Sequence, residues 1–277
     1  AYLKAEITTP SWHSFFYALV LLSIVFMVWE WVAPWRKNQR RFRKGFWLDA
    51  FYMFFNVFIF SLIGFAGLAA VTEAAFRSGL TSLGIDNWVA VEVSSWSPWV
   101  QVLVLFVVRD FIHWNVHRLL HKSPFLWEFH KVHHSVEEMG FAAHLRFHWM
   151  ETVVYKSLEY IPLGLIGFGI DDFFAAHLLA LAWGHFNHAN IKLPLGPLGY
   201  VFNNPQMHIW HHAKTLPRRT GVNFGLTLSI WDYLFRTAYI PRDGRDEPLG
   251  FDELQEFPEH FVGQAIYPLS KRRHRDE

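Results

Sequence analysis

The sequence predicts an all-α integral membrane protein with about four core transmembrane helices and a cytoplasmic helical cap. Three observations predict this class. Of the 277 residues, 52% are hydrophobic and only 18% are charged. Long uncharged apolar runs fill the N-terminal part, and 14 of the 17 histidines lie between His113 and His212. A net charge of +1 argues against a nucleic-acid binder, and the absence of cysteine excludes disulfides and thiolate sites.

Three runs have the length and composition of membrane spans. They cover residues 11–29, 51–71 and 93–108, and the last can continue as a helix to about residue 120. A bilayer core needs about 20 helical residues, so 51–71 spans it comfortably and the other two span it with Trp-rich ends. The first run lacks a basic flank and a small-residue cleavage site, which favours a span over a signal peptide. The flanking tryptophans resemble an interfacial belt: Trp29, Trp31, Trp35, Trp47, Trp96 and Trp99.

The distribution of charge predicts the orientation of these spans. The loop 36–44 carries six basic residues and no acid, whereas 73–92 carries three acids and one base. Basic loops remain on the cytoplasmic side, so the first loop is expected inside and the second outside. The third span then returns to the cytoplasmic face and delivers His117 and His121 there.

The chain is expected to form one functional unit with two regions. Residues 1–116 hold the N-terminal transmembrane helices, and 117–277 hold the histidine-rich region. Within the second region, 161–170 and 173–191 lack Lys, Arg, Asp and Glu and are separated by Asp171 and Asp172. They predict a membrane hairpin at about 152–191. Residues 192–277 are more charged and richer in Pro and Gly, and are expected to form the C-terminal cytoplasmic cap.

The histidines fall into four short clusters. Residues at i, i+3 and i+4 of a helix share one face, so each cluster can present two or three imidazoles together. Two imidazoles at this spacing can bind one metal ion, and four clusters suit two ions. The clusters are His117 with His121; His130 with His133 and His134; His185 with His188; and His208 with His211 and His212.

The ligand type narrows the choice of metal. Imidazole suits zinc, copper, iron and nickel, and a structural zinc site would close with four ligands. A nitrogen-rich pair of redox-active ions fits better, and two iron ions are expected, with zinc or another metal able to replace them in a purified sample. His113 lies on the same stripe as His117 but is not expected to bind metal. His144 and His148 stay open, and the remaining histidines, His13, His177, His260 and His274, are expected to be structural or solvated.

Carboxylates are the expected outer partners of these imidazoles, because a ligating histidine commonly donates its second N–H to one. Asp110 lies two helical turns before His117. Glu151 and Asp232 are further candidates, and His148 could join this outer layer. Glu137 and Glu138 are expected to be solvated charges.

Several stretches together resemble the fatty acid hydroxylase/sterol desaturase superfamily of membrane non-haem diiron oxygenases. The resemblance is dense over about 110–237, and the N-terminal spans match only in hydropathy. The matching stretches are DFIHWNVHRLLH at 110–121, LWEFHKVHHS at 126–135, RFHWME at 146–151, HAN at 188–190, PQMHIWHH at 205–212, and NFG at 223–225 followed by WDYLFRT at 231–237. Three positions depart from the family pattern: His113 replaces an aromatic, Gly140 an Asn and Arg236 a Gly.

The resemblance implies four core transmembrane helices under a cytoplasmic cap and two irons held by all clusters. It leaves His185 open, because the spacing of the third cluster varies in the family. The implied ligands are His117, His121, His130, His133, His134, His188, His208, His211 and His212.

The expected activity is oxygen-dependent hydroxylation, or desaturation, of an unactivated C–H bond in a membrane lipid. Dioxygen is the co-substrate, and electrons come from a ferredoxin, haem protein or reductase at the cytoplasmic face. The expected location is multi-pass in a bacterial inner membrane or the endoplasmic reticulum. Three alternatives remain. A metal transporter would place ligands along a path at mid-membrane. A membrane zinc hydrolase would carry an HExxH motif, which this sequence lacks. A bis-histidine haem protein would not need the HxxHH doublets.

Overall fold

The structure is a computed structural model that describes residues 8, 14–58, 78–79, 81–84, 91–164, 166–168, 170–216, 218 and 220–273. Within these residues all regular elements are helical, apart from three isolated β-bridges. The part of the second predicted span, 51–71, that follows residue 58 lies outside the described residues. Most of the loop 73–92 lies outside them as well. The number of membrane spans is therefore a prediction that the described residues leave untested.

Two described helices are long and apolar enough to cross a membrane: α2 (Phe15–Val32) and α5 (Pro98–Lys122). In α2 only 11% of the residues are buried, and Leu21, Ile24 and Val28 are exposed. Such an uncovered apolar surface is costly in water and stable in lipid. α3 (Phe46–Phe54) begins after Gly45, whose positive φ of 78° starts the turn out of the basic loop.

The other long helices pack around α5. α7 (Trp149–Gly164) and α8 (Ile170–His188) occupy the segment predicted as the membrane hairpin, and both pack on α5. α6 (Pro124–His134) follows α5 after Ser123, which caps the new helix by accepting a hydrogen bond from Leu126 N. Pro124 occupies the first position of α6, where the N–H that proline lacks would have no partner within the helix. The chain turns at Ser123, and α6 packs back against α5.

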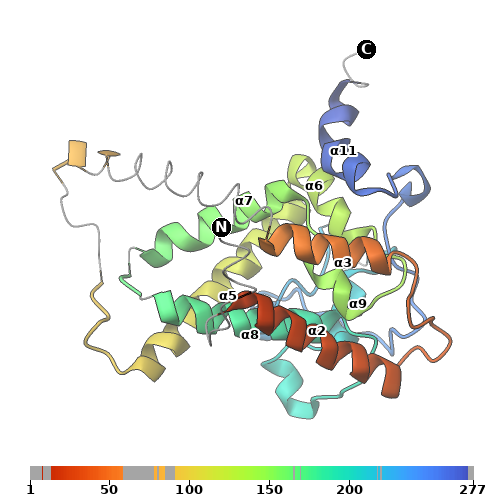
Figure 1. Ribbon diagram of the computed structural model, residues 1–277, viewed down its shortest axis with the longest axis horizontal. Coiled ribbons are helices and arrows are strands. Elements are labelled where there is room, and N and C mark those ends of the chain that lie inside the picture. Colours follow the sequence, from red (N-terminus) through yellow and green to blue (C-terminus); the bar gives the residue numbers. More distant parts are fainter. Residues whose placement is uncertain are drawn as a thin grey trace.

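Shorter elements complete the cap. α9 (Pro205–His211) begins at Asn204, whose side chain accepts from Met207 N. Figure 1 shows the histidine-bearing helices α6 and α9 at one end of the group formed by α5, α7 and α8. The remaining elements are the 3-10 helices η2 (Phe141–Leu145), η3 (Gly196–Tyr200) and η4 (Leu254–Glu256), with α10 (Ile230–Leu234) and α11 (Phe261–Arg273).

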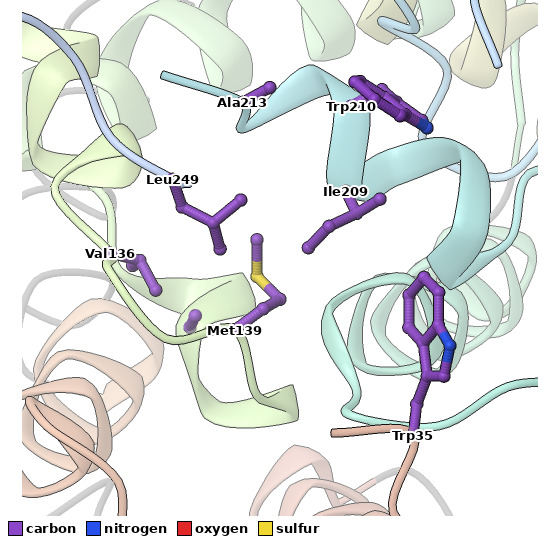
Figure 2. Close-up of a cluster of buried hydrophobic side chains, with 8 residues drawn as sticks. Trp35, Val136, Met139, Ile209, Trp210, Ala213 and Leu249 are labelled. Carbon is purple, nitrogen blue, oxygen red and sulfur yellow. The ribbon is translucent and has the colours of Figure 1, made fainter. Parts of the chain in front are cut away.

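A buried apolar cluster fixes α9 against the rest of the cap. Ile209 and Trp210 from α9 meet Trp35 from the loop after α2, and Met139 from the loop before η2 (Figure 2). Leu249 closes the cluster from the C-terminal side. Burying large apolar side chains contributes about 1.5–3 kcal/mol each. The cluster therefore holds the side of α9 that does not carry the histidines.

A buried charge group joins α3 to the segment after η2. Asp49 pairs with Arg43 and, at 3.1 Å from Oδ1 to Nη1, with Arg146. All three side chains are at most 6% exposed, so the two guanidinium groups share one carboxylate in a position where water contributes little. Gly140 is required here, because a Cβ would collide with the Arg43 side chain. This contact explains one of the three departures seen in the sequence.

Candidate metal centre

Nine buried histidines converge in two groups, and within each group the ligand atoms lie within 4.8 Å of one another. The groups draw on the end of α5, on α6, on the end of α8 and on α9. The first group is His117, His121, His130, His134 and His211, and the second is His133, His188, His208 and His212.

The two HxxHH motifs divide between these groups in opposite senses. In α6, His130 and His134 belong to the first group and His133 to the second. In α9, His208 and His212 belong to the second group and the middle histidine, His211, to the first. Positions i and i+4 lie on one stripe of a helix, and i+3 points to its side. Each motif therefore supplies both groups at once.

Backbone carbonyls fix the orientation of several rings. The Nδ1 atoms of His117, His211 and His188 lie 2.8 Å from the carbonyl oxygens of Phe224, Val222 and Gly184, respectively. A carbonyl can only accept, so each Nδ1 carries the proton and donates it. Each Nε2 is then unprotonated and carries a lone pair, and this is the form of the atom that binds a metal.

The Nε2 atoms of several rings face one another. His117 Nε2 lies 3.2 Å from His130 Nε2, and in the second group His208 Nε2 lies 3.1 Å from His188 Nε2. Because His130 Nδ1 donates to Glu151, the first pair sets two lone pairs face to face, and these repel unless a cation lies between them. Nitrogens bound to one ion at about 2.0–2.1 Å would be separated by about 3.0–3.4 Å. The buried His121 Nε2 has no hydrogen-bond partner among the described residues, as expected for a further ligand. The donor set therefore fits two metal ions.

The rings outside the predicted spans are held neutral. Burial, reinforced by neighbouring imidazoles, keeps the pKa values of His133, His134, His208 and His212 well below the usual 6.5. Burial also lowers the pKa of His211 to about 3. A protonated imidazole cannot bind a cation, so this environment prepares the rings as ligands at neutral pH.

The predicted outer partners take different positions. Glu151 Oε2 lies 2.6 Å from His130 Nδ1, so this carboxylate directly orients a ring of the first group. His148 contacts no ring of either group; its Nε2 lies 2.9 Å from Ala265 O and ties α7 to α11. Glu137 and Glu138 bind Lys44 at the surface.

Asp110 and Asp232 act on the histidines through the loop 222–228. Asp110 accepts from Thr227 N, Leu228 N and Trp231 Nε1. Asp232 accepts from Trp114 Nε1, Phe224 N, Gly225 N and Thr237 Oγ1. Both carboxylates therefore hold the loop 222–228, and that loop supplies the carbonyls that receive His117 and His211.

His185 and His144 contact each other and belong to neither group. His185 Nδ1 lies 3.1 Å from His144 Nδ1, and its Nε2 lies 3.4 Å from Ser23 Oγ on α2. A side chain at Gly184 would collide with the His144 ring, so this glycine makes room for the pair. The placement of His185 gives it a contact between helices, and its role as a ligand stays a prediction.

Two charged residues beside the site were not predicted from the sequence. Arg109 and Glu159 form a buried ion pair between α5 and α7, and Glu159 also binds His113. The available signal was the position of both charges within predicted membrane segments, where ionisable groups are commonly functional. The carbonyl partners carried no signal, because any residue has one.

We expect Glu151→Gln to weaken metal binding about 10- to 100-fold, because outer partners of ligating histidines have effects of this size. The substitution removes the negative charge of Glu151. That charge orients the His130 ring and raises its basicity. Metal titration of the metal-free protein measures the change. Glu137→Gln is the matched control, since Glu137 is exposed and binds Lys44. Equal affinities for Glu151→Gln and the unaltered protein would contradict the assignment.

Comparisons with known proteins agree with this geometry. The fatty acid hydroxylase family model matches residues 102–237. The ornithine lipid hydroxylase of Rhizobium tropici is 32% identical over 177 residues, covering 64% of this chain and 53% of that protein. An alkylglycerol monooxygenase of Caenorhabditis elegans is 31% identical over 168 residues, covering 59% and 31%. Methylsterol monooxygenase 1 of Rattus norvegicus is 28% identical over 134 residues, covering 47% and 44%.

No solved structure matches significantly. The chain spans about half the length of these curated relatives or less. The matched region contains all nine histidines of the two groups, and both aspartates that hold the loop 222–228. The chain therefore belongs to the fatty acid hydroxylase family.

Proposed function

We propose that this protein hydroxylates, or desaturates, an unactivated C–H bond of a membrane lipid, with two iron ions held by the two histidine groups. The observation that carries the proposal is the convergence of nine buried imidazoles, with facing Nε2 atoms, into two adjacent groups. Iron bound by nitrogen ligands supplies dioxygen activation. For hydroxylation, one oxygen atom enters the C–H bond and the other leaves as water, with two electrons and two protons from a donor.

The residues of the chain would position the lipid and exclude water. A partly open cavity borders both histidine groups. His117 and His130 of the first group line it, as do His133, His188 and His208 of the second. Phe147, Tyr155 and Leu226 supply apolar and aromatic wall around the same space. A C–H bond held there would lie beside both ions and away from bulk water.

The membrane would deliver the substrate and the cytoplasm the electrons. The exposed apolar surface of α2 and the length of α5 support an integral membrane location. The basic loop 36–44 supports a cytoplasmic position for the metal groups. A ferredoxin, haem protein or reductase would dock on that face.

The proposal is tested with ¹⁸O₂ on purified, iron-loaded protein supplied with a reductant and membrane lipid. We expect ¹⁸O in a lipid hydroxyl group, detected by mass spectrometry, and no product without iron or dioxygen. A desaturated lipid that appears only with iron and dioxygen would select the desaturase form. Full lipid turnover by the zinc-loaded protein, without incorporation of ¹⁸O, would favour a hydrolase. Metal uptake into liposomes without lipid oxidation would favour a transporter. Either result would overturn the proposal.

A further inference from the structure

A buried polar triad, His113, Glu159 and Arg109, adjoins the cavity through His113. His113 Nδ1 lies 2.9 Å from Glu159 Oε1, and Arg109 Nη2 lies 3.1 Å from Glu159 Oε2. The three side chains are 13%, 3% and 10% exposed, for His113, Glu159 and Arg109 in turn. The metal groups use none of them. A buried arrangement of this kind requires a reason, because polar groups cost free energy when they are removed from water.

The triad fixes the tautomer of His113. Glu159 is ionised opposite Arg109, and a carboxylate can only accept, so Nδ1 of His113 must carry the proton. Because Arg109 already neutralises Glu159, no second positive charge is needed on the imidazole. Nε2 of the neutral ring is then a hydrogen-bond acceptor, and no described residue donates to it.

The same ring lines the cavity. His113 stacks on Tyr155 at 4.4 Å between ring centroids, and both residues border the space shared with the metal groups. The centroid of His113 lies 6.3 Å from that of His117, one helical turn along α5. A group that contacts His113 would thus lie within a few carbon atoms of a C–H bond held beside His117.

We propose that His113 is a specificity-determining residue that accepts a hydrogen bond from a hydroxyl or amide N–H of the lipid, close to the oxidised carbon. This inference rests on the proposed function and narrows it. The preferred substrate is a lipid oxidised near its polar junction and not at the far end of a plain hydrocarbon chain. Glu159 and Arg109 are positioning residues, because they act only by holding the imidazole in its accepting tautomer.

Three probes of equal acyl chain length separate the possible donors. A fatty acyl methyl ester has no donor, an N-methyl fatty amide has an N–H, and a monoacylglycerol has hydroxyls. Their affinities are measured anaerobically without reductant, on the metal-loaded protein in nanodiscs, so that no turnover occurs. We expect at least one donor lipid to bind about tenfold more tightly than the methyl ester, the size of one buried neutral hydrogen bond. The arm that shows the preference identifies the donor.

Two substitutions test the residue. His113→Phe keeps the ring on Tyr155 but removes the acceptor, and is expected to bind all three lipids alike. His113→Gln is expected to keep part of the preference, because its amide can donate to Glu159 and accept from the lipid. Leu226→Ala is the matched control, since Leu226 lines the same cavity without a polar group. It should weaken all three lipids equally and leave the ratios unchanged.

The outcomes separate this inference from the proposed function. Equal affinity of the unaltered protein for all three lipids, which needs no variant, overturns the inference. So does an unchanged preference in His113→Phe. A donor preference that depends on His113 supports the inference even where ¹⁸O₂ turnover is absent, and the absence of turnover counts against the proposed function alone.

Discussion

Replacement of His212 by alanine is expected to lower the bound metal from two ions per chain to one. His212 belongs to the group of four, and its Nε2 lies 3.2 Å from His208 Nε2. Its loss leaves three ligands there, while the group of five is untouched. If the two ions act as a unit, lipid hydroxylation should fall by on the order of 10³-fold or more, as for other catalytic groups that function together.

Metal analysis of the purified protein checks the stoichiometry, and the ¹⁸O₂ assay checks turnover. His260→Ala is the matched control, because His260 is exposed and belongs to neither group. His121→Ala adds a second comparison, since the group of five would still keep four ligands and should retain its ion better. Two tightly bound ions in His212→Ala would contradict the two-group assignment.

Asp232→Ala is expected to reduce the free energy of unfolding by about 4 kcal/mol. The carboxylate accepts four hydrogen bonds in a fully buried position. Burial raises the pKa of Asp232, and the four donors oppose that rise, led by Thr237 and Trp114. Alanine would leave these donors unpaired, and each buried unpaired donor costs about 1–3 kcal/mol. Partial relaxation of the loop would recover some of the sum.

The same substitution should also weaken metal binding. Phe224 and Gly225 donate to Asp232, and the carbonyl of Phe224 receives His117. Denaturant unfolding in detergent measures stability, and metal titration measures affinity. Asp232→Asn keeps the shape and one accepting oxygen, so its loss of stability should be smaller. A loss below about 1 kcal/mol for Asp232→Ala would show that the loop does not depend on this carboxylate.

The sequence was most informative where chemistry and helical period coincide. The i, i+3 and i+4 spacing predicted grouped imidazoles, and the nine histidines implied by the resemblance are the nine that the structure brings together. The division of each HxxHH motif between two groups depends on how α6 and α9 face each other. That is a tertiary relation which no local spacing contains.

Other features of the site could not be predicted from the sequence pattern, for different reasons. The orienting carbonyls of Val222, Phe224 and Gly184 belong to the backbone, which the side-chain sequence does not specify. Asp110 and Asp232 were selected as direct partners of histidine, but their oxygens bind N–H groups of the 222–228 loop and nearby side chains. The pairing of Arg109 with Glu159 joins residues 50 positions apart and needed the packing of α5 on α7.

The burial of the nine rings has a consequence for how the protein acquires its metal. None of the nine histidines is more than 9% exposed, so we expect an ion to enter or leave only when the walls of the partly open cavity beside them move apart. Exchange is then governed by the rate of that opening and not by affinity alone. The ions present while the cap closes would be retained, so metal identity would be decided during biogenesis, under kinetic control, and not by later equilibrium with the cell's metal pool.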